Sequence, residues 1–127
     1  MSKRLEVVIV DDEVQITELL KTFLQCSSKQ SNIHTFNDSI EAKNYLAENK
    51  VDVLITDYKM PKCDGIQLME SLDSNVKKIL ISGYVSEIAE ERLQKLDAVF
   101  FEKPVPMKAL GSIINDQEKI NKITDHY

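Results

Sequence analysis

The sequence lacks the features of several classes of protein. No apolar run approaches the roughly 18 residues of a membrane-spanning helix. The first residues lead straight into a short apolar segment, without the longer stretch and cleavage site of a secretory signal. Cysteine is scarce, and Cys26 and Cys63 form no CxxC pair, so neither a zinc site nor a disulfide framework is indicated. We therefore expect reduced thiols in a cytoplasmic protein that does not contact membranes.

Basic residues are outnumbered by acidic ones. The 127 residues include 16 Lys and Arg against 21 Asp and Glu, which gives a net charge of −5. Binding along a nucleic-acid backbone depends on clustered basic residues. We therefore expect no direct contact with nucleic acid, and the length fits one folded domain.

What the chain does contain is a set of short apolar runs. Residues 7–10, 53–55 and 98–101 are too short for a capped helix and too continuously apolar for a strand with one wet face. Such runs are typical of strands that are buried on both faces in a parallel sheet. Residues 32–36 and 77–82 complete the predicted set of strands.

Helices are predicted between these strands. After Asp12, apolar residues recur at helical spacing and form one face that we expect to be buried. These residues are Ile16, Leu19, Leu20, Phe23 and Leu24. Residues 38–49, residues 66–72 and a segment capped by Ser86 are the next predicted helices. A last helix starts near Pro106, and its expected buried residues are Met107, Leu110, Ile113 and Ile114.

The alternation of strands and helices predicts a sheet that is covered on both faces. The expected fold class is α/β: a flavodoxin-like three-layer sandwich, with a five-stranded parallel sheet of order 2-1-3-4-5 and five helices. Ligands bind such sheets at the carboxyl edge, where the chain reverses direction between the first and third strands. Asp11 and Asp12 leave the first strand at that point, and Asp57 leaves the third.

Each polar residue at this edge also has a simpler explanation. Asp12 can cap the next helix, Asp57 can be a loop acid, and Ser82 can belong to a tight turn. Lys103 can be a solvated charge. The predicted topology nevertheless brings them together, and carboxylates about 4 Å apart repel by roughly 4 kcal/mol at an effective dielectric constant near 20. A hard divalent cation such as Mg²⁺, together with Lys103, would balance this charge. Without metal, one carboxylate should titrate at an unusually high pH.

Several motifs follow the predicted strands. They are Val10-Asp11-Asp12-Glu13, Thr56-Asp57-Tyr58-Lys59-Met60-Pro61 with Asp64-Gly65, Ile81-Ser82-Gly83, and Phe100-Phe101-Glu102-Lys103-Pro104. In this order and spacing they resemble the receiver domain of two-component response regulators, with a chemotaxis-regulator-like fold, over about residues 4–118. We expect residues 1–118 to form the receiver domain and residues 119–127 to form a C-terminal tail or an extension of the fifth helix.

The resemblance implies a phosphoacceptor signalling switch in a two-component phosphorelay. Asp57 would accept a phosphoryl group from a sensor histidine kinase or a histidine phosphotransfer protein. Asp12 and Asp57 would bind Mg²⁺ directly, and Asp11 would bind it through water. Lys59 would bind the metal through its backbone carbonyl, and Lys103 would hold the phosphoryl oxygens. The only expected reactions are self-directed phosphotransfer and autodephosphorylation, so we do not expect an enzyme that acts on other molecules.

The resemblance also implies how phosphorylation is reported. Ser82 would swing to hydrogen-bond the phosphoryl group, and Phe100 would turn inward in response. This would change the surface of the fourth helix, fifth strand and fifth helix, which would control an output domain or a partner protein. Lys59 and Tyr84 match positions that tune the access of hydrolytic water, and we expect both to slow dephosphorylation. The peptide bond between Lys103 and the following proline is typically cis in the family.

Other interpretations predict different residues. An interaction module independent of phosphorylation would usually lose the acidic pair, the acceptor or the lysine. A hydrolase acting through an aspartyl phosphate commonly carries a second Asp where this chain has Lys59. A flavin-binding electron carrier would need a phosphate-cradling loop after the first strand, which here is acidic. At the C-terminus, Ile120 and Ile123 continue a helical spacing, which indicates either a polar tail or a helix that reaches an output domain or a second copy in a homodimer.

Overall fold

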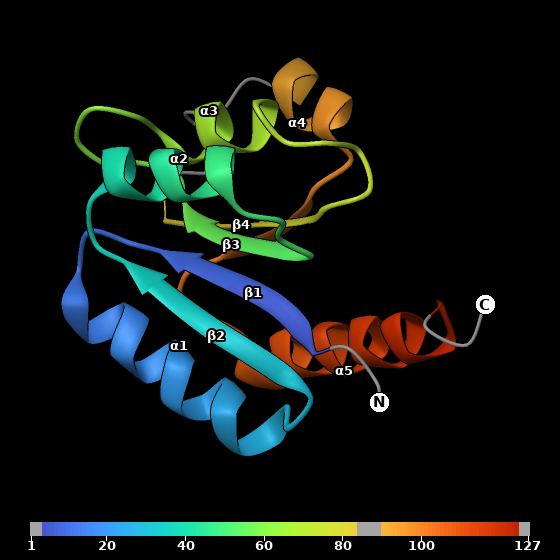
Figure 1. Ribbon diagram of the computed structural model, residues 1–127. Coiled ribbons are helices and arrows are strands. Elements are labelled where there is room, and N and C mark those ends of the chain that lie inside the picture. Colours follow the sequence, from blue (N-terminus) through green and yellow to red (C-terminus); the bar gives the residue numbers. More distant parts are fainter. Residues whose placement is uncertain (1–3, 84–89, 125–127) are drawn as a thin grey trace.

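The computed structural model describes residues 4–83 and 90–124, which form a parallel sheet between two layers of helices (Figure 1). The strands are β1 (Leu5–Val10), β2 (Ser31–Phe36), β3 (Val53–Asp57), β4 (Lys77–Ser82) and β5 (Val99–Glu102). The helices are α1 (Val14–Ser27), α2 (Ser39–Glu48), α3 (Gly65–Glu70), α4 (Glu90–Leu96) and α5 (Met107–Thr124). Within the described residues the sheet has 5 strands in the order β2-β1-β3-β4-β5, and all pairs are parallel. The predicted fold class and strand order are confirmed.

The two layers of helices explain the apolar character of the strands. Figure 1 shows α1 and α5 on one face of the sheet and α2, α3 and α4 on the other. Alternate residues of a strand point to opposite faces, so Val7 and Ile9 pack with α1 and α5, while Val8 and Val10 pack with α2 and α3. These residues of β1 are at most 1% exposed. A strand that is buried on both sides has no position for a polar residue until it ends.

The inward face of α1 differs from the predicted one at a single residue. Leu20 and Leu24 are buried, but Leu19 is 56% exposed, so the prediction that Leu19 faces the core is wrong. Thr17 is buried instead. Positions 17, 20 and 24 share one side of the helix, whereas Leu19 is rotated about 100° away from Leu20.

The C-terminal helix α5 is hydrogen-bonded to the start of β2. The Glu118 carboxylate accepts hydrogen bonds from the backbone N–H of Gln30 (3.0 Å) and the hydroxyl of Ser31 (2.5 Å). The helix continues to Thr124, and Ile120 on this last part is 54% exposed. Of the residues that we expected to be buried in α5, Leu110 and Ile114 are fully buried. Met107 and Ile113 are partly buried and pack against the same core.

Some expected features of the fourth helix lie outside the described residues. The expected Ser86 cap is one of them, since α4 is described from Glu90 onward. The third helix ends at Glu70, earlier than predicted.

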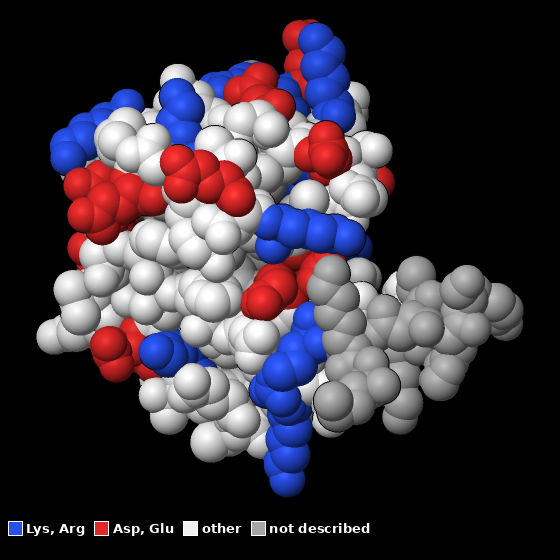
Figure 2. Space-filling view, in the orientation of Figure 1, with Lys and Arg blue, Asp and Glu red and all other residues white. Residues whose placement is uncertain are grey.

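No helix among residues 4–83 and 90–124 is long and apolar enough to cross a membrane. On the face seen in Figure 2, the basic side chains of the described residues are interspersed with acidic ones and form no continuous basic area.

The end of β3 is fixed by a close approach of the backbone at Gly65. The Gly65 N–H donates to the carbonyl of Tyr58 (2.8 Å), and Asp64 and Gln67 form a capping box at the start of α3. A Cβ atom at Gly65 would overlap the backbone oxygen of Asp57. Glycine is therefore required here for space.

We predict that Gly65→Ala lowers the free energy of unfolding by about 3 kcal/mol or more, because backbone atoms cannot move away as a flexible side chain can. Gly83→Ala is the control, since a Cβ at Gly83 would meet no atom within 4 Å. Urea denaturation of both variants measures the difference. Equal stability of the two variants would contradict the conclusion that glycine is required at position 65.

Candidate functional site

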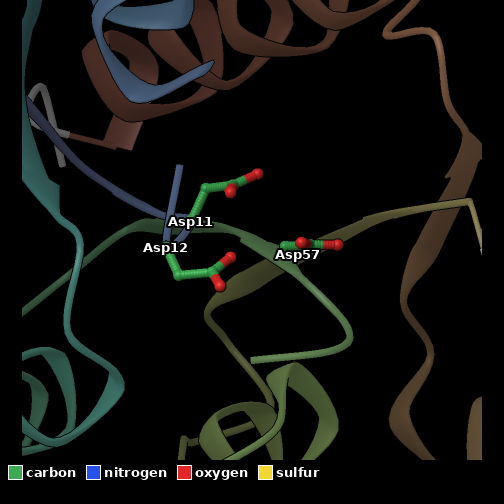
Figure 3. A group of neighbouring side chains, drawn as sticks. All are labelled: Asp11, Asp12 and Asp57. Carbon is green, nitrogen blue, oxygen red and sulfur yellow. The ribbon is translucent and has the colours of Figure 1, made fainter. Parts of the chain in front are cut away.

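Three carboxylates converge at the carboxyl edge of the sheet, where β1 and β3 end side by side. Asp11 and Asp12 follow β1, and Asp57 is the last residue of β3. Figure 3 shows their side chains extending toward the same region from these neighbouring strands. One oxygen of each carboxylate lies within 4.8 Å of one oxygen of the others. Asp11 is 3% exposed and Asp57 8%, whereas Asp12 is exposed at the rim.

Local backbone hydrogen bonds orient the two buried carboxylates. Asp11 Oδ1 accepts from the backbone N–H of Glu13 (2.9 Å), and Asp57 Oδ1 accepts from that of Tyr58 (2.8 Å). Each carboxylate therefore keeps its second oxygen for another partner.

Asp12 does not cap α1, although the sequence allows it. The N-cap residue is Glu13, and its side chain makes no capping hydrogen bond. The described residues provide no hydrogen bond to the Asp12 side chain either. Helix capping therefore does not explain the presence of Asp12, and its carboxylate is available to a ligand.

Lys103 supplies the positive charge of the site. Its Nζ lies 3.3 Å from Asp57 Oδ2 and 3.5 Å from Asp11 Oδ2. The backbone N–H of Lys103 donates to the carbonyl of Ser82 (3.0 Å), which joins the loop after β5 to the end of β4. The peptide bond to Pro104 is cis, as the resemblance implied.

Burial and mutual repulsion change the titration of these groups. Burial is the main reason why the pKa of Asp11 rises from 3.8 to about 6, and the nearby Asp57 adds to the shift. Burial likewise raises the pKa of Asp57, although Lys103 opposes it. For Lys103, burial acts to lower the pKa, but attraction to Asp11 and Asp57 outweighs burial and raises it. The expectation that one carboxylate titrates at an unusually high pH agrees with Asp11.

The donor set fits a hard divalent cation. All ligand atoms that the three aspartates offer are oxygens, which Mg²⁺ and Ca²⁺ prefer. Among residues 4–83 and 90–124, the ammonium of Lys103 contacts this group of three carboxylates, and these four side chains together keep a net negative charge when all are ionised. A cation would remove this imbalance.

The other predicted site residues differ in how deeply they are buried. Ser82 ends β4, is fully buried, and follows Ile81, the register partner of Asp57. Phe100 in β5 is half-buried and packs against the core under α2, α3 and α4. Lys59 is exposed in the loop after β3. Tyr84 lies outside the described residues.

Two residues support the site through contacts that the sequence patterns did not reveal. Gly65 was part of a motif, but the close approach to Asp57 is visible only in three dimensions. Asn37 donates a hydrogen bond to the carbonyl of Asp11 (2.9 Å) from the turn after β2. No local pattern signals Asn37, because its partners are remote in sequence.

A parallel sheet with an acidic group and a lysine at its switch point defines a chemotaxis-regulator-like α/β domain. Residues 7–115 match the family model of the response regulator receiver domain. The chain belongs to this family, and the resemblance inferred from the motifs is confirmed.

Two curated proteins with related sequences are longer than this chain. Over 71 residues it is 41% identical to response regulator GtcR of Aneurinibacillus migulanus, covering 56% of this chain and 28% of that protein. Over 101 residues it is 32% identical to the protein-glutamate methylesterase/protein-glutamine glutaminase of Bdellovibrio bacteriovorus, covering 77% of this chain. That alignment also covers 28% of the relative. The aligned part is therefore less than a third of the length of each protein.

Solved structures share the fold along the whole domain. The response regulator receiver domain protein from Clostridium thermocellum superposes with a TM-score of 0.79 at 25% identity. The superposition covers 94% of this chain and 98% of that one.

We predict that Asp11→Asn stabilises the metal-free protein at neutral pH. The folded-state pKa of Asp11 is about 6 against 3.8 for the ordinary group, so the wild type loses stability as pH rises between these values. Removing the charge should raise the free energy of unfolding by roughly 1–3 kcal/mol above pH 7 and change it little near pH 4. Urea denaturation in EDTA across this pH range measures the effect. A gain that does not depend on pH would contradict the prediction.

Proposed function

We propose that the protein is a phosphoacceptor switch and that Asp57 is the residue that is phosphorylated. The observation that carries this proposal is the environment of Asp57 Oδ2, which lies 3.3 Å from Lys103 Nζ and beside two further carboxylates. An oxygen in this position can attack the phosphorus of a phosphohistidine. The new O–P bond forms as the P–N bond breaks, and the electron pair returns to the imidazole nitrogen, which takes up a proton.

The other residues of the site would position and neutralise the phosphoryl group. Mg²⁺, held by Asp12 and Asp57 directly, by Asp11 through water and by the Lys59 carbonyl, would supply charge neutralisation at the phosphoryl oxygens. Lys103 would bind the phosphoryl oxygens as well and add a second positive charge. No separate general base is needed, since a carboxylate is already the nucleophile.

Ser82 and Phe100 are the proposed reporters of the phosphorylated state. Ser82 would turn its hydroxyl to the phosphoryl group, and Phe100 would move further into the core. A hydrogen bond to a charged group contributes about 1.5–3 kcal/mol. A shift from 1:99 to 99:1 requires about 5.5 kcal/mol of differential binding. We therefore infer that the active state is already partly populated, or that a partner completes the shift.

The proposed partners follow from the family. A sensor histidine kinase or histidine phosphotransfer protein would supply the phosphoryl group. The surface of α4, β5 and α5 would control an output domain or a separate protein, and the exposed Ile120 on α5 supports either this contact or a homodimer. We propose a cytoplasmic site of action without direct nucleic-acid contact.

An enzyme acting on other molecules is not the favoured function. The Bdellovibrio relative is named for methylesterase and glutaminase activities, but this chain spans 28% of its length. Lys59, two residues after Asp57, cannot act as the second acid of an aspartyl-phosphate hydrolase. We propose that the chemistry is limited to self-directed phosphotransfer and autodephosphorylation.

Incubation with acetyl phosphate and Mg²⁺ tests the proposal. We expect the intact mass to increase by one phosphoryl group in the wild type and not in Asp57→Asn. Asp116→Asn, which changes an exposed aspartate on α5, is the matched control and should be labelled normally. EDTA should abolish labelling, because Lys103 alone cannot balance the charge. If neither acetyl phosphate nor a phosphorylated phosphotransfer protein labels Asp57, the proposed function is wrong.

The lifetime of the phosphorylated form tests the roles of Lys59 and Tyr84. We predict that Lys59→Ala and Tyr84→Ala each shorten the half-life of the acyl phosphate, because a smaller side chain admits water more easily. Lys50→Ala, which changes an exposed lysine after α2, should leave it unchanged. The decay of the phosphorylated mass after removal of the donor measures all three variants. A half-life equal to that of the wild type would refute the role of the substituted residue.

A further inference from the structure

The connection from β2 into α2 contacts the turn after β1 and the loop after β3, the two segments beside the acidic residues. It consists of the turn residues Asn37 and Asp38 and of Ser39, the first residue of α2. Asn37 binds the turn between β1 and α1, which contains Asp11 and Asp12. Asp38 and Ser39 bind the loop between β3 and α3, which begins after Asp57.

Asn37 holds the turn after β1 through both hydrogens of one amide group. Its Nδ2 donates to the carbonyl oxygen of Asp11 (2.9 Å) and to Thr17 Oγ1 (2.9 Å). The Thr17 hydroxyl donates in turn to the carbonyl of Val14 (3.0 Å) and is almost fully buried. The N–H of Asp11 also donates to the carbonyl of Phe36 (3.1 Å). Both backbone groups of Asp11 are therefore bound by the end of β2 and the turn that follows it.

This attachment matters most for Asp12, whose exposed carboxylate receives no hydrogen bond from the described residues. The direction in which Asp12 points therefore depends on the backbone of the turn. Asn37 fixes that backbone on one side of Asp12, and the Glu13 N–H, bonded to Asp11 Oδ1, fixes it on the other.

Ser39 binds the loop between β3 and α3. Its Oγ donates to the carbonyl of Pro61 (2.7 Å), which also accepts from the N–H of Cys63 (2.9 Å). Ser39 is 4% exposed, so this hydrogen bond is shielded from water. The ion pair of Asp38 with Lys62 (3.1 Å) lies at the surface and contributes little.

We propose that Asn37 and Ser39 are positioning residues that set the separation of the two loops and thereby the affinity of the acidic site for Mg²⁺. Residues that orient metal ligands typically change metal affinity by about 10- to 100-fold when they are replaced. By linkage, metal binding should also protect the first turn of α2. This inference rests on the proposed function only in taking Mg²⁺ as the ligand.

The test is the Mg²⁺ dissociation constant of the full chain, from amide shifts in NMR titrations, with metal-free stability measured separately by urea denaturation. Asn37→Ala and Ser39→Ala should each weaken Mg²⁺ binding by about tenfold or more. Asn49→Ala is the matched control, because it removes a hydrogen bond to Tyr45 at the opposite end of α2 and should leave affinity unchanged. Since the variants act on different loops, either one alone tests the proposal if the other fails to fold.

Asn37→Asp separates positioning from simple electrostatics. It places a negative charge near a cation site but removes both donors, so positioning predicts weaker Mg²⁺ binding and electrostatics predicts tighter binding. Tighter binding by this variant, or unchanged affinity in Asn37→Ala and Ser39→Ala, would overturn the proposal. A wild type that binds Mg²⁺ but gains no phosphoryl group would refute the phosphoacceptor function and not the positioning role.

Discussion

Charge balance at the carboxyl edge of the sheet is the constraint on which the rest of the structure depends. Asp11 and Asp57 are nearly buried and share the ammonium of Lys103, while Asp12 adds a third carboxylate at the rim. Burial of like charges opposes folding, and a domain has only a small margin of stability. The apolar sheet and its two helical layers must therefore supply the stability that holds these groups together. A cation that binds here would reduce the repulsion between carboxylates at the place where that repulsion destabilises the fold most.

Much of the fold could be predicted because burial on both faces leaves a plain pattern in the strands. The continuous apolar run of β1 and the alternation with helices indicated a parallel sheet covered on both faces, and the flavodoxin-like strand order expected for such a sheet placed Asp11, Asp12 and Asp57 at one edge. Contacts between side chains and remote backbone were not predictable. Asn37 is 26 residues from Asp11, and nothing local marks it. Leu19 was misplaced because the spacing of α1 is compatible with two adjacent faces, and packing selected the one that contains Thr17.

Lys103 connects the chemistry of the site to the part of the sheet that we propose as its reporter. Its ammonium contacts the ends of β1 and β3, and its backbone N–H binds the carbonyl of Ser82 at the end of β4. A change in the charge around the Lys103 ammonium therefore acts on a residue whose backbone is hydrogen-bonded to the end of β4. This short connection requires no long chain of coupled side chains.

The hydrogen bonds of Glu118 show that contacts between α5 and the sheet continue past the family match. The family match stops at residue 115, yet Glu118 satisfies the N–H of Gln30 and the hydroxyl of the buried Ser31. A recombinant fragment cut at the family boundary would leave both groups without this acceptor, at the start of an edge strand. Fusions to this domain should therefore keep α5 at least through Glu118.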